Sequence, residues 1–422
     1  MPRSAEPAGD RMPQAPDRRS TLAMIGVCAL VYFLDGLVHT ILGPLAPDFG
    51  RALHLDAAAI GPIFSANLIG QCIGLVALPP LAARYGDRLV IALSLAGFGA
   101  AQAASGFAGD GTALFWWRLV TGIFLGGCLP SCLALVTAVA PPARRGLAIT
   151  SLFTGYGLGA AMAGMVAAAF IDLGGWRAAM VAVGAVCLAS AILAWLFLRD
   201  GSDPDAVDTA IEPAANPLEL LSARYRLGTL LLWLLFITML TISYCLSSWL
   251  PLLLVRLGHD QSFAAVALSI FSFGGIAAAL VVGALIDRFG PTRVLVTFLL
   301  VAASLFLVTG WLIDEASARL LQLLLAGCGF FALGAYGGVN VVLAGFYPYR
   351  LRSTGIGWAK SVGRVGTVAA PVLIGIGLKA GVSEVTILSS FALPALLSAI
   401  ALAALGVFNS AKAVGAARRQ ES

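Results

Sequence analysis

Twelve long apolar segments follow one another along the chain, separated by short polar turns. At 1.5 Å per residue, a helix of such length crosses a hydrocarbon core of about 30 Å. Polar and apolar residues do not alternate within the segments, as they would in barrel strands. The pattern therefore predicts an all-α membrane protein whose twelve transmembrane helices lie near residues 22–46, 58–82, 88–108, 112–140, 146–171, 175–198, 227–254, 263–286, 292–313, 319–347, 353–379 and 384–408.

The composition supports the same class of protein. Hydrophobic residues make up 59% of the chain and charged residues only 11%. Soluble domains carry about a quarter of their residues as charged side chains. A chain with half that fraction lacks the material for a solvated surface. In lipid every backbone polar group has to be satisfied internally, which favours helices.

One long polar interior stretch, residues 199–226, divides the chain almost in half, and it is rich in acidic residues and proline. We interpret it as a cytoplasmic linker between an N-terminal six-helix bundle (residues 21–198) and a C-terminal six-helix bundle (residues 227–409). Residues 1–20 have the composition of a disordered cytoplasmic tail, and residues 410–422 form a second tail. The first span is not followed by a small-residue cleavage pattern, so we expect it to remain in the mature protein.

Basic residues gather on one side of the predicted membrane. Of the 26 Lys and Arg residues, eighteen fall in the termini and loops on the linker side, five fall on the other side, and three lie inside spans. Cytoplasmic loops carry the excess of Lys and Arg, so both termini are expected in the cytoplasm. The net charge of +5 thus reports orientation, and we expect no nucleic-acid partner.

The two halves carry an echoing turn between their second and third spans. The first turn contains Arg84 and Gly86, and the second contains Asp287, Arg288 and Gly290. Repeated halves are a known transporter architecture, with the substrate site between them near the middle of the membrane. We predict two pseudo-symmetric bundles, in which these five residues serve conformational change.

A few ionisable residues lie at membrane depth: Asp35, His39, Arg118, Lys360 and Arg364. A charge at the bilayer centre costs about 2.5 kcal/mol or more, so each is a functional-site candidate. Asp35 and His39 are four residues apart and share a helix face, as do Lys360 and Arg364. An acidic face opposite a cationic face suits a small organic anion that moves with a proton. We predict Asp35, His39 and Arg118 for proton coupling, and Lys360 and Arg364 for substrate binding.

Each of these residues also has a structural interpretation. Arg118 could reach toward the end of its span or pair with Asp35. Lys360 could extend toward the cytoplasmic end of its helix. His39 could be a packing residue. Tyr336, Asn340 and Trp358 complete the predicted substrate set; such aromatic side chains stack on planar ligands but also occur as core or lipid-belt residues.

The sequence gives no sign of a metal site, a cofactor or a catalytic centre. The seven cysteines fall in apolar runs and the three histidines are scattered, so no metal-ligand spacing is present. No zinc-protease motif, nucleophile elbow or phosphate-binding loop occurs. We expect neither an enzyme nor a bound cofactor.

Several motifs resemble those of the major facilitator superfamily and, more narrowly, its aromatic acid:proton symporters. The resemblance implies the fold of that superfamily and uptake of an aromatic carboxylate, such as a hydroxybenzoate, with protons across a bacterial inner membrane by a monomer. The motifs are Leu34-Asp35-Gly36, Arg118-Leu119-Val120-Thr121-Gly122, Gly175-Trp176-Arg177, Ser248-Trp249-Leu250-Pro251, Asp287-Arg288-Phe289-Gly290, Phe346-Tyr347-Pro348, Thr354-Gly355-Ile356-Gly357-Trp358 and Gly363-Arg364-Val365-Gly366.

By position, Asp35 matches the family's first membrane acid, Arg118 its fourth-span arginine and Arg364 its eleventh-span arginine. The chain lacks the family's second acid, which would stand at Val38; adjacent His39 is a possible replacement. Further departures fall at Pro79, Ala83, Ser131 and Ala138.

An exporter or antiporter of another organic anion or drug-like molecule is the alternative function. The glycine-rich fifth span is partly similar to antiporter helices, although it lacks the proline that follows glycine there. The substrate and the number of protons stay open at this stage.

Overall fold

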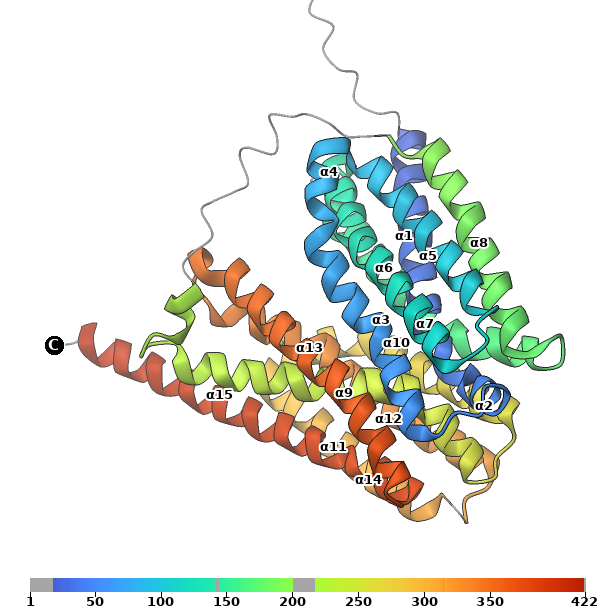
Figure 1. Ribbon diagram of the computed structural model, residues 1–422. Helices are drawn as coiled ribbons and strands as arrows, with labels where there is room; N and C mark the ends of the chain where they lie inside the picture. The colour runs from blue at the N-terminus through green and yellow to red at the C-terminus, as the bar shows by residue number, and fades with distance from the viewer. Residues whose placement is uncertain (1–17, 142–143, 200–216, 314, 421–422) are drawn as a thin grey trace, which may run out of the picture.

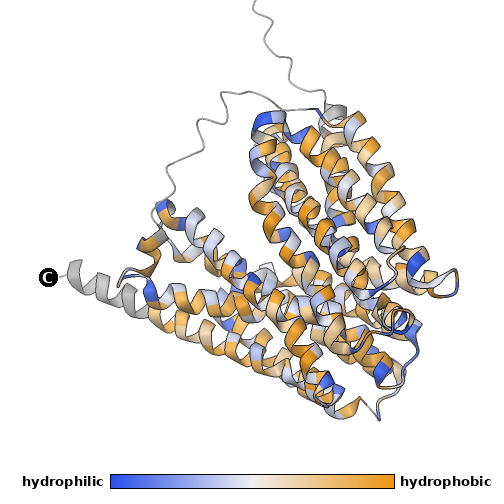
Figure 2. Cartoon of the chain, viewed as in Figure 1, coloured by the Kyte–Doolittle hydropathy of each residue, from blue (hydrophilic) through white to orange (hydrophobic). Residues whose placement is uncertain are grey.

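The structure is a computed structural model that describes residues 18–141, 144–199, 217–313 and 315–420. Within these ranges, twelve helices are long and apolar enough to cross a membrane, which confirms the predicted fold class (Figure 1). Hydrophobic residues cover the bodies of these helices, and polar residues gather toward their ends (Figure 2). The chain is therefore a multi-pass membrane protein.

The first half contains eight helical segments that form six spans. They are α1 (Arg18–Thr40), α2 (Leu42–Ala52), α3 (Ala57–Ala77), α4 (Pro79–Tyr85), α5 (Asp87–Ser105), α6 (Gly111–Val139), α7 (Arg145–Ile171) and α8 (Gly175–Phe197).

The second half begins with a short 3₁₀ helix and also supplies six spans. Its elements are η3 (Pro217–Leu221), α9 (Arg226–Arg256), α10 (Gln261–Phe289), α11 (Pro291–Leu312), α12 (Ala318–Phe346), α13 (Tyr349–Lys379), α14 (Glu384–Ser390) and α15 (Ala392–Gln420). Most of the predicted linker and of the N-terminal tail lies outside the described residues. At the other terminus, α15 continues past residue 408, where the sequence pattern placed the end of the last span.

Each span runs between two ends of the molecule. We call one end the linker end, because residues 199 and 217, which flank the undescribed linker stretch, lie there with Gly86 and Gly290. The opposite end carries residues 53–56, 106–110, 172–174, 257–260, 315–317 and 380–383, which connect successive spans. Asp56, Asp110 and Asp260 cap the N-termini of α3, α6 and α10 at this opposite end. Their carboxylates accept backbone N–H groups that the first helical turn leaves unpaired.

The first span is broken where the pattern predicts one helix. α1 ends at Thr40, and α2 begins at Leu42. Pro44 has no N–H, so the carbonyl of Thr40 lacks its usual donor four residues on, and the helix is interrupted there. The span also continues to Ala52, beyond the predicted end at residue 46. This break lies immediately after Asp35 and His39.

Glycines bring helices of the same half into backbone contact. A Cβ at Gly36 would lie 2.1 Å from the carbonyl oxygen of Tyr156, and one at Gly159 would lie 1.8 Å from that of Phe33. These positions join α1 to α7. Small residues permit such an approach in lipid, where no hydrophobic force drives helices together. In the fifth span, Gly155 and Gly164 also lie against the backbone of another helix, whereas Gly157 makes only an ordinary contact with Ile276.

The two halves touch each other between mid-membrane and the opposite end. α3 meets α13 there, where the Ser65 hydroxyl donates to the carbonyl oxygen of Val368 at 2.7 Å. A Cβ at Gly375 would lie 2.4 Å from the carbonyl oxygen of Ala57, so these two helices are in backbone contact. α7 likewise meets α10, and α2 meets α9. Toward the linker end the two halves diverge (Figure 1).

A substitution at Gly159 tests the packing of α1 against α7. We expect Gly159→Val to lower the free energy of unfolding by about 1–3 kcal/mol or more, because its side chain would overlap the backbone of Phe33. Thermal unfolding of the purified protein in detergent measures the effect. The matched control is Gly157→Ala, two residues away, which meets no atom closer than 3.6 Å. Equal unfolding temperatures for the two variants would contradict the packing described here.

Candidate functional site

One face of α1 is directed at the contact between the two halves. His39 lies on it, with its ring 4.9 Å from the ring of Tyr244 on α9, in an edge-to-face arrangement. Its Nδ1 atom is 3.2 Å from the side-chain amide nitrogen of Asn67 on α3. His39 therefore contacts both halves of the molecule, and Asp35 lies one turn earlier on the same face.

Asp35 is completely buried, and neither of its carboxylate oxygens has a hydrogen-bond partner within the described ranges. The cation whose charge acts on it is Arg364, from the second half. Burying an ionised carboxylate without a partner costs several kcal/mol. A proton would remove that cost, so the position suits a group that gains and loses one.

Arg364 extends across the contact between the halves. Its guanidinium donates to the side-chain oxygen of Gln71 on α3 at 2.9 Å. Positions 360, 364, 368, 371 and 375 recur every three or four residues, so they form one face of α13 that is directed at the first half. Lys360 lies one turn nearer the linker end on this face and is exposed. The two predicted cations thus follow one another along this face of α13, with Arg364 nearer the middle of the membrane.

Three tyrosines lie near these charges. Tyr156 comes from α7, Tyr244 from α9 and Tyr336 from α12, so both halves contribute. Tyr156 interacts electrostatically with Asp35, Tyr244 and Tyr336, and Tyr336 interacts with Arg364. Hydroxyl groups from both halves therefore lie within electrostatic range of the acid and the guanidinium.

Two other predicted substrate residues are placed differently. Trp358 stacks on Trp233 of α9, with ring centroids 6.1 Å apart and planes 22° apart, and is 44% exposed. It lies six residues before Arg364, which puts it on another face of α13. Asn340 directs its amide at the carbonyl oxygens of Tyr336 and Gly337 in its own helix. The structure thus does not bring Trp358 to the central cluster.

Arg118 has neither of the structural roles that the sequence suggested. It is completely buried, so it does not extend toward the end of its span. Its partners are the side-chain oxygen of Gln102 on α5 and the carbonyl oxygen of Val38 on α1, the latter at 3.0 Å, so it does not pair with Asp35. The guanidinium instead binds the α1 backbone between Asp35 and the break at residue 41.

The predicted conformational residues lie in the turns at the linker end. Gly86 has φ 89° and ψ 151°, and Gly290 has φ 83° and ψ 149°. This backbone conformation is essentially restricted to glycine. The two turns therefore share one geometry, as the sequence echo indicates. Arg84 and Arg288 lie over the adjacent rings of Tyr85 and Phe289, and Asp287 lies in the last turn of α10, next to Arg288.

Sequence reasoning missed the amides that hold the central charges. Asn67 and Gln71 are one helical turn apart on α3 and bind His39 and Arg364 respectively, and Gln102 binds Arg118. The spacing of Asn67 and Gln71 inside an apolar span was a detectable signal. Tyr156 was also missed, because nothing in its local sequence separates it from a packing tyrosine.

The described residues contain no group of three or more His, Cys, Asp or Glu side chains that could hold a metal ion. The seven cysteines are free thiols. Arg364, Asp35 and the tyrosines are thus the chemistry that the centre offers: a cation for an anionic group, an acid for a proton, and hydroxyl groups and rings.

Twelve spans in two halves, with costly charges where the halves meet, define a membrane transporter. The chain matches the Major Facilitator Superfamily over residues 28–268 and 257–422, and it belongs to that family.

Two relatives are similar over almost their full length. The gallate transporter of Pseudomonas putida is 32% identical over 408 residues, which cover 90% of both chains. The 3-(3-hydroxy-phenyl)propionate transporter of Escherichia coli (strain K12) is 33% identical over 401 residues, covering 93% of this chain and 95% of the relative.

Among solved structures, a bacterial homolog to the human lysosomal transporter Spinster, in an inward-facing and unoccupied conformation, superimposes with a TM-score of 0.69. It is 20% identical and covers 93% of this chain and 95% of its own. This similarity concerns the fold.

The partners of Arg118 lead to a stability prediction. We expect Arg118→Leu to destabilise the protein by about 1–3 kcal/mol, because it leaves buried oxygens of Gln102 and Val38 without donors. Denaturant unfolding in detergent measures the loss. Because Arg118 does not pair with Asp35, adding Asp35→Asn should change stability additively, within about 0.5 kcal/mol. Recovery of stability in the double variant would reveal a pairing between the two residues.

Proposed function

We propose that this protein is a secondary active transporter that takes up an aromatic carboxylate together with protons by alternating access. The observation that carries the proposal is the arrangement at mid-membrane, where Arg364 of one half reaches Gln71 of the other beside the unpartnered carboxylate of Asp35. A half-buried cation at membrane depth attracts an anionic cargo, and a buried acid without a fixed partner can exchange a proton.

The relatives support the aromatic carboxylate as cargo. Gallate and 3-(3-hydroxy-phenyl)propionate, named for the relatives in Pseudomonas putida and Escherichia coli, both combine a carboxylate with a hydroxylated ring. In our proposal the carboxylate binds Arg364. The ring lies among Tyr156, Tyr244 and Tyr336, whose hydroxyl groups serve as partners for ring hydroxyls.

The remaining predicted residues take supporting roles in this proposal. Lys360 attracts the anion from the linker end. His39 stands beside the position where the aromatic acid symporters carry a second acid, and it links Asn67 to Tyr244. Arg118 holds the α1 backbone that carries Asp35. Tyr336 contacts cargo directly, whereas Asn340 and Trp358 shape the passage between the centre and the linker end.

We place the protein in a bacterial inner membrane, with residues 1–20, 199–226 and 410–422 in the cytoplasm and a single chain as the working unit. The excess of basic residues at the linker end supports this orientation. The described conformation then has its halves together on the periplasmic side and apart on the cytoplasmic side. It corresponds to the state that releases cargo into the cell.

The energetics of the cycle depend on how many protons accompany each anion. One proton with a monovalent anion is electrically neutral, so the pH gradient supplies about 1.4 kcal/mol per unit. A second proton would add the membrane potential, about 2.3 kcal/mol per 100 mV. The absence of an acid at position 38 favours the smaller number.

Neutralising Asp35 tests the proton role. In proteoliposomes with a pH gradient of one unit, we expect the wild type to accumulate a hydroxybenzoate about tenfold. Asp35→Asn should abolish this accumulation and retain exchange of internal for external substrate. The control is Asp172→Asn, an exposed acid at the opposite end. Gradient-driven uptake by Asp35→Asn at the wild-type level would remove Asp35 from the coupling.

Arg364 provides a second test, on binding rather than transport. A charge-assisted hydrogen bond contributes about 1.5–3 kcal/mol, so Arg364→Gln should weaken binding of an aromatic carboxylate about 10- to 100-fold. Thermal shift of the purified protein against benzoates, hydroxybenzoates, cinnamates and dicarboxylates gives the affinities, with neutral benzamides as matched ligands. Arg319→Gln, at an exposed position, is the control. Equal loss of amide and carboxylate binding would argue against a carboxylate on Arg364.

A further inference from the structure

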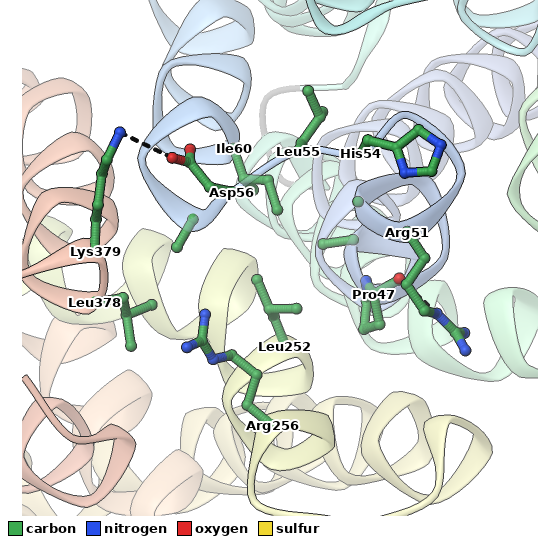
Figure 3. A pocket seen from close by; sticks show the side chains of 13 residues that line it. Pro47, Arg51, His54, Leu55, Asp56, Ile60, Leu252, Arg256, Leu378 and Lys379 are labelled. Atoms are coloured by element: carbon green, nitrogen blue, oxygen red, sulfur yellow. Dashed lines mark hydrogen bonds and ion pairs between the residues drawn. The ribbon is translucent and has the colours of Figure 1, made fainter. Parts of the chain in front are cut away.

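A pocket of about 540 Å³ opens at the opposite end, on the far side of the membrane from the separated halves. Both halves line it: α2, the 53–56 turn and α3 on one side, and α9 and α13 on the other (Figure 3). It lies directly outside the contact between α3 and α13 that closes this end. A solute that enters from this side meets the pocket before it reaches the central cluster.

The wall of the pocket carries an excess of positive charge. Arg51, Arg256 and Lys379 line it, with the imidazole of His54, whereas Asp56 is the one acid among its lining residues. Three cations against one carboxylate leave a formal net charge of +2 among the lining residues, and Glu384, which pairs with Arg256 from outside the lining, reduces the excess to +1. A charged concave wall raises the local concentration of ions of opposite sign.

Contacts to neighbouring groups leave part of this charge available. Lys379 pairs with Asp56 across the two halves at 2.9 Å. The Nε of Arg256 donates to Glu384 at 2.6 Å, while its terminal nitrogens point into the space below Asp56 (Figure 3). The guanidinium of Arg51 turns away from that space and donates to Gln261. Arg256 and Lys379 are therefore the cations that face an incoming anion.

The Asp56–Lys379 pair is too exposed to act as a strong lock. The Lys379 side chain is 64% exposed and that of Asp56 is 50% exposed. Exposed ion pairs contribute at most about 1 kcal/mol. The hydrogen bond from Lys379, together with the backbone N–H of Ala59, lowers the pKa of Asp56 below its usual value, so Asp56 stays ionised at neutral pH. It can then mask Lys379 while this side is closed.

From these observations we propose that the pocket is an entry vestibule that collects organic carboxylates, using Arg256 and Lys379, before they pass to Arg364. Asp56 screens Lys379 in the closed state and releases it when the halves part at this end. The identity of the cargo rests on the proposed function, whereas the anion-collecting field does not.

The vestibule and an alternative, in which the Asp56–Lys379 pair merely holds this end closed, predict different changes in transport when the pair is broken. Lys379→Gln and Asp56→Asn both break the ion pair, so a lock predicts the same change in transport for both. Collection by charge predicts opposite changes, because one variant removes a positive charge and the other a negative one. Asparagine also caps helices well, so Asp56→Asn preserves the N-terminus of α3.

Uptake kinetics at low ionic strength provide the first measurement. We expect Lys379→Gln and Arg256→Gln each to raise the KM for hydroxybenzoate about threefold and Asp56→Asn to lower it, at an unchanged maximal rate. In 0.5 M potassium chloride the differences should disappear, because the Debye length falls to a few Å. Arg319→Gln, which removes a charge at the same end but outside the pocket, should leave KM unchanged. Changes of the same sign in Lys379→Gln and Asp56→Asn, or no change, would overturn the vestibule.

A chemical probe measures the field without any transport. Leu55→Cys places a thiol in the pocket wall, and anionic and cationic methanethiosulfonates report the local potential through the ratio of their reaction rates. We expect the ratio of the anionic to the cationic reaction rate to fall in Lys379→Gln and to rise in Asp56→Asn. The protein that retains Leu55 measures the background reaction of the native cysteines. A ratio that does not respond overturns the vestibule. A wild type that takes up no aromatic carboxylate overturns the proposed function instead, and the ratio still decides whether anions collect.

Discussion

The free-energy cost of removing a polar group from water constrains where each charged residue of this protein can lie. In the bilayer each charge needs a partner or a reason to be unpartnered. Three of the polar side chains at the centre have a partner: His39 has Asn67, Arg118 has Gln102, and Arg364 has Gln71. Of the two charged side chains that are fully buried within the described ranges, Arg118 has hydrogen-bond partners and Asp35 has none. A group that the fold leaves unsatisfied in one conformation is free to change its state between conformations.

Arg118 and Arg364 show how one residue type acquires two roles from its surroundings. Arg118 joins α6 to α5 and α1 within the first half, so its contacts can persist while the halves move. Arg364 joins the second half to Gln71 of the first, so its contact has to change in the transport cycle proposed here. The pattern of charges along the chain could not separate these cases. Only the partner, and the half to which it belongs, distinguishes a structural arginine from a moving one.

The sequence predicted the features that depend on local pattern. The spans follow from apolar runs, and the paired turns at Gly86 and Gly290 follow from a repeated motif with one backbone geometry. The sequence pattern could not predict hydrogen-bond partners that come from distant helices, such as Gln71 for Arg364. The break after Thr40 was missed, although Pro44 accounts for it. Trp358 was assigned by residue type alone, and its helical phase relative to Arg364 places it elsewhere.

The face of α13 directed at the first half carries a glycine on each side of its central arginine. Gly375 meets the backbone of Ala57, whereas Gly357 has nothing within 4 Å. Gly357 lies seven residues before Arg364, almost two full turns, and therefore in line with it. One of the two glycine positions on this face is thus packed against the first half, and the other has no neighbour. On one face of a single helix, backbone contact with the first half is therefore made on one side of Arg364 and left open on the other.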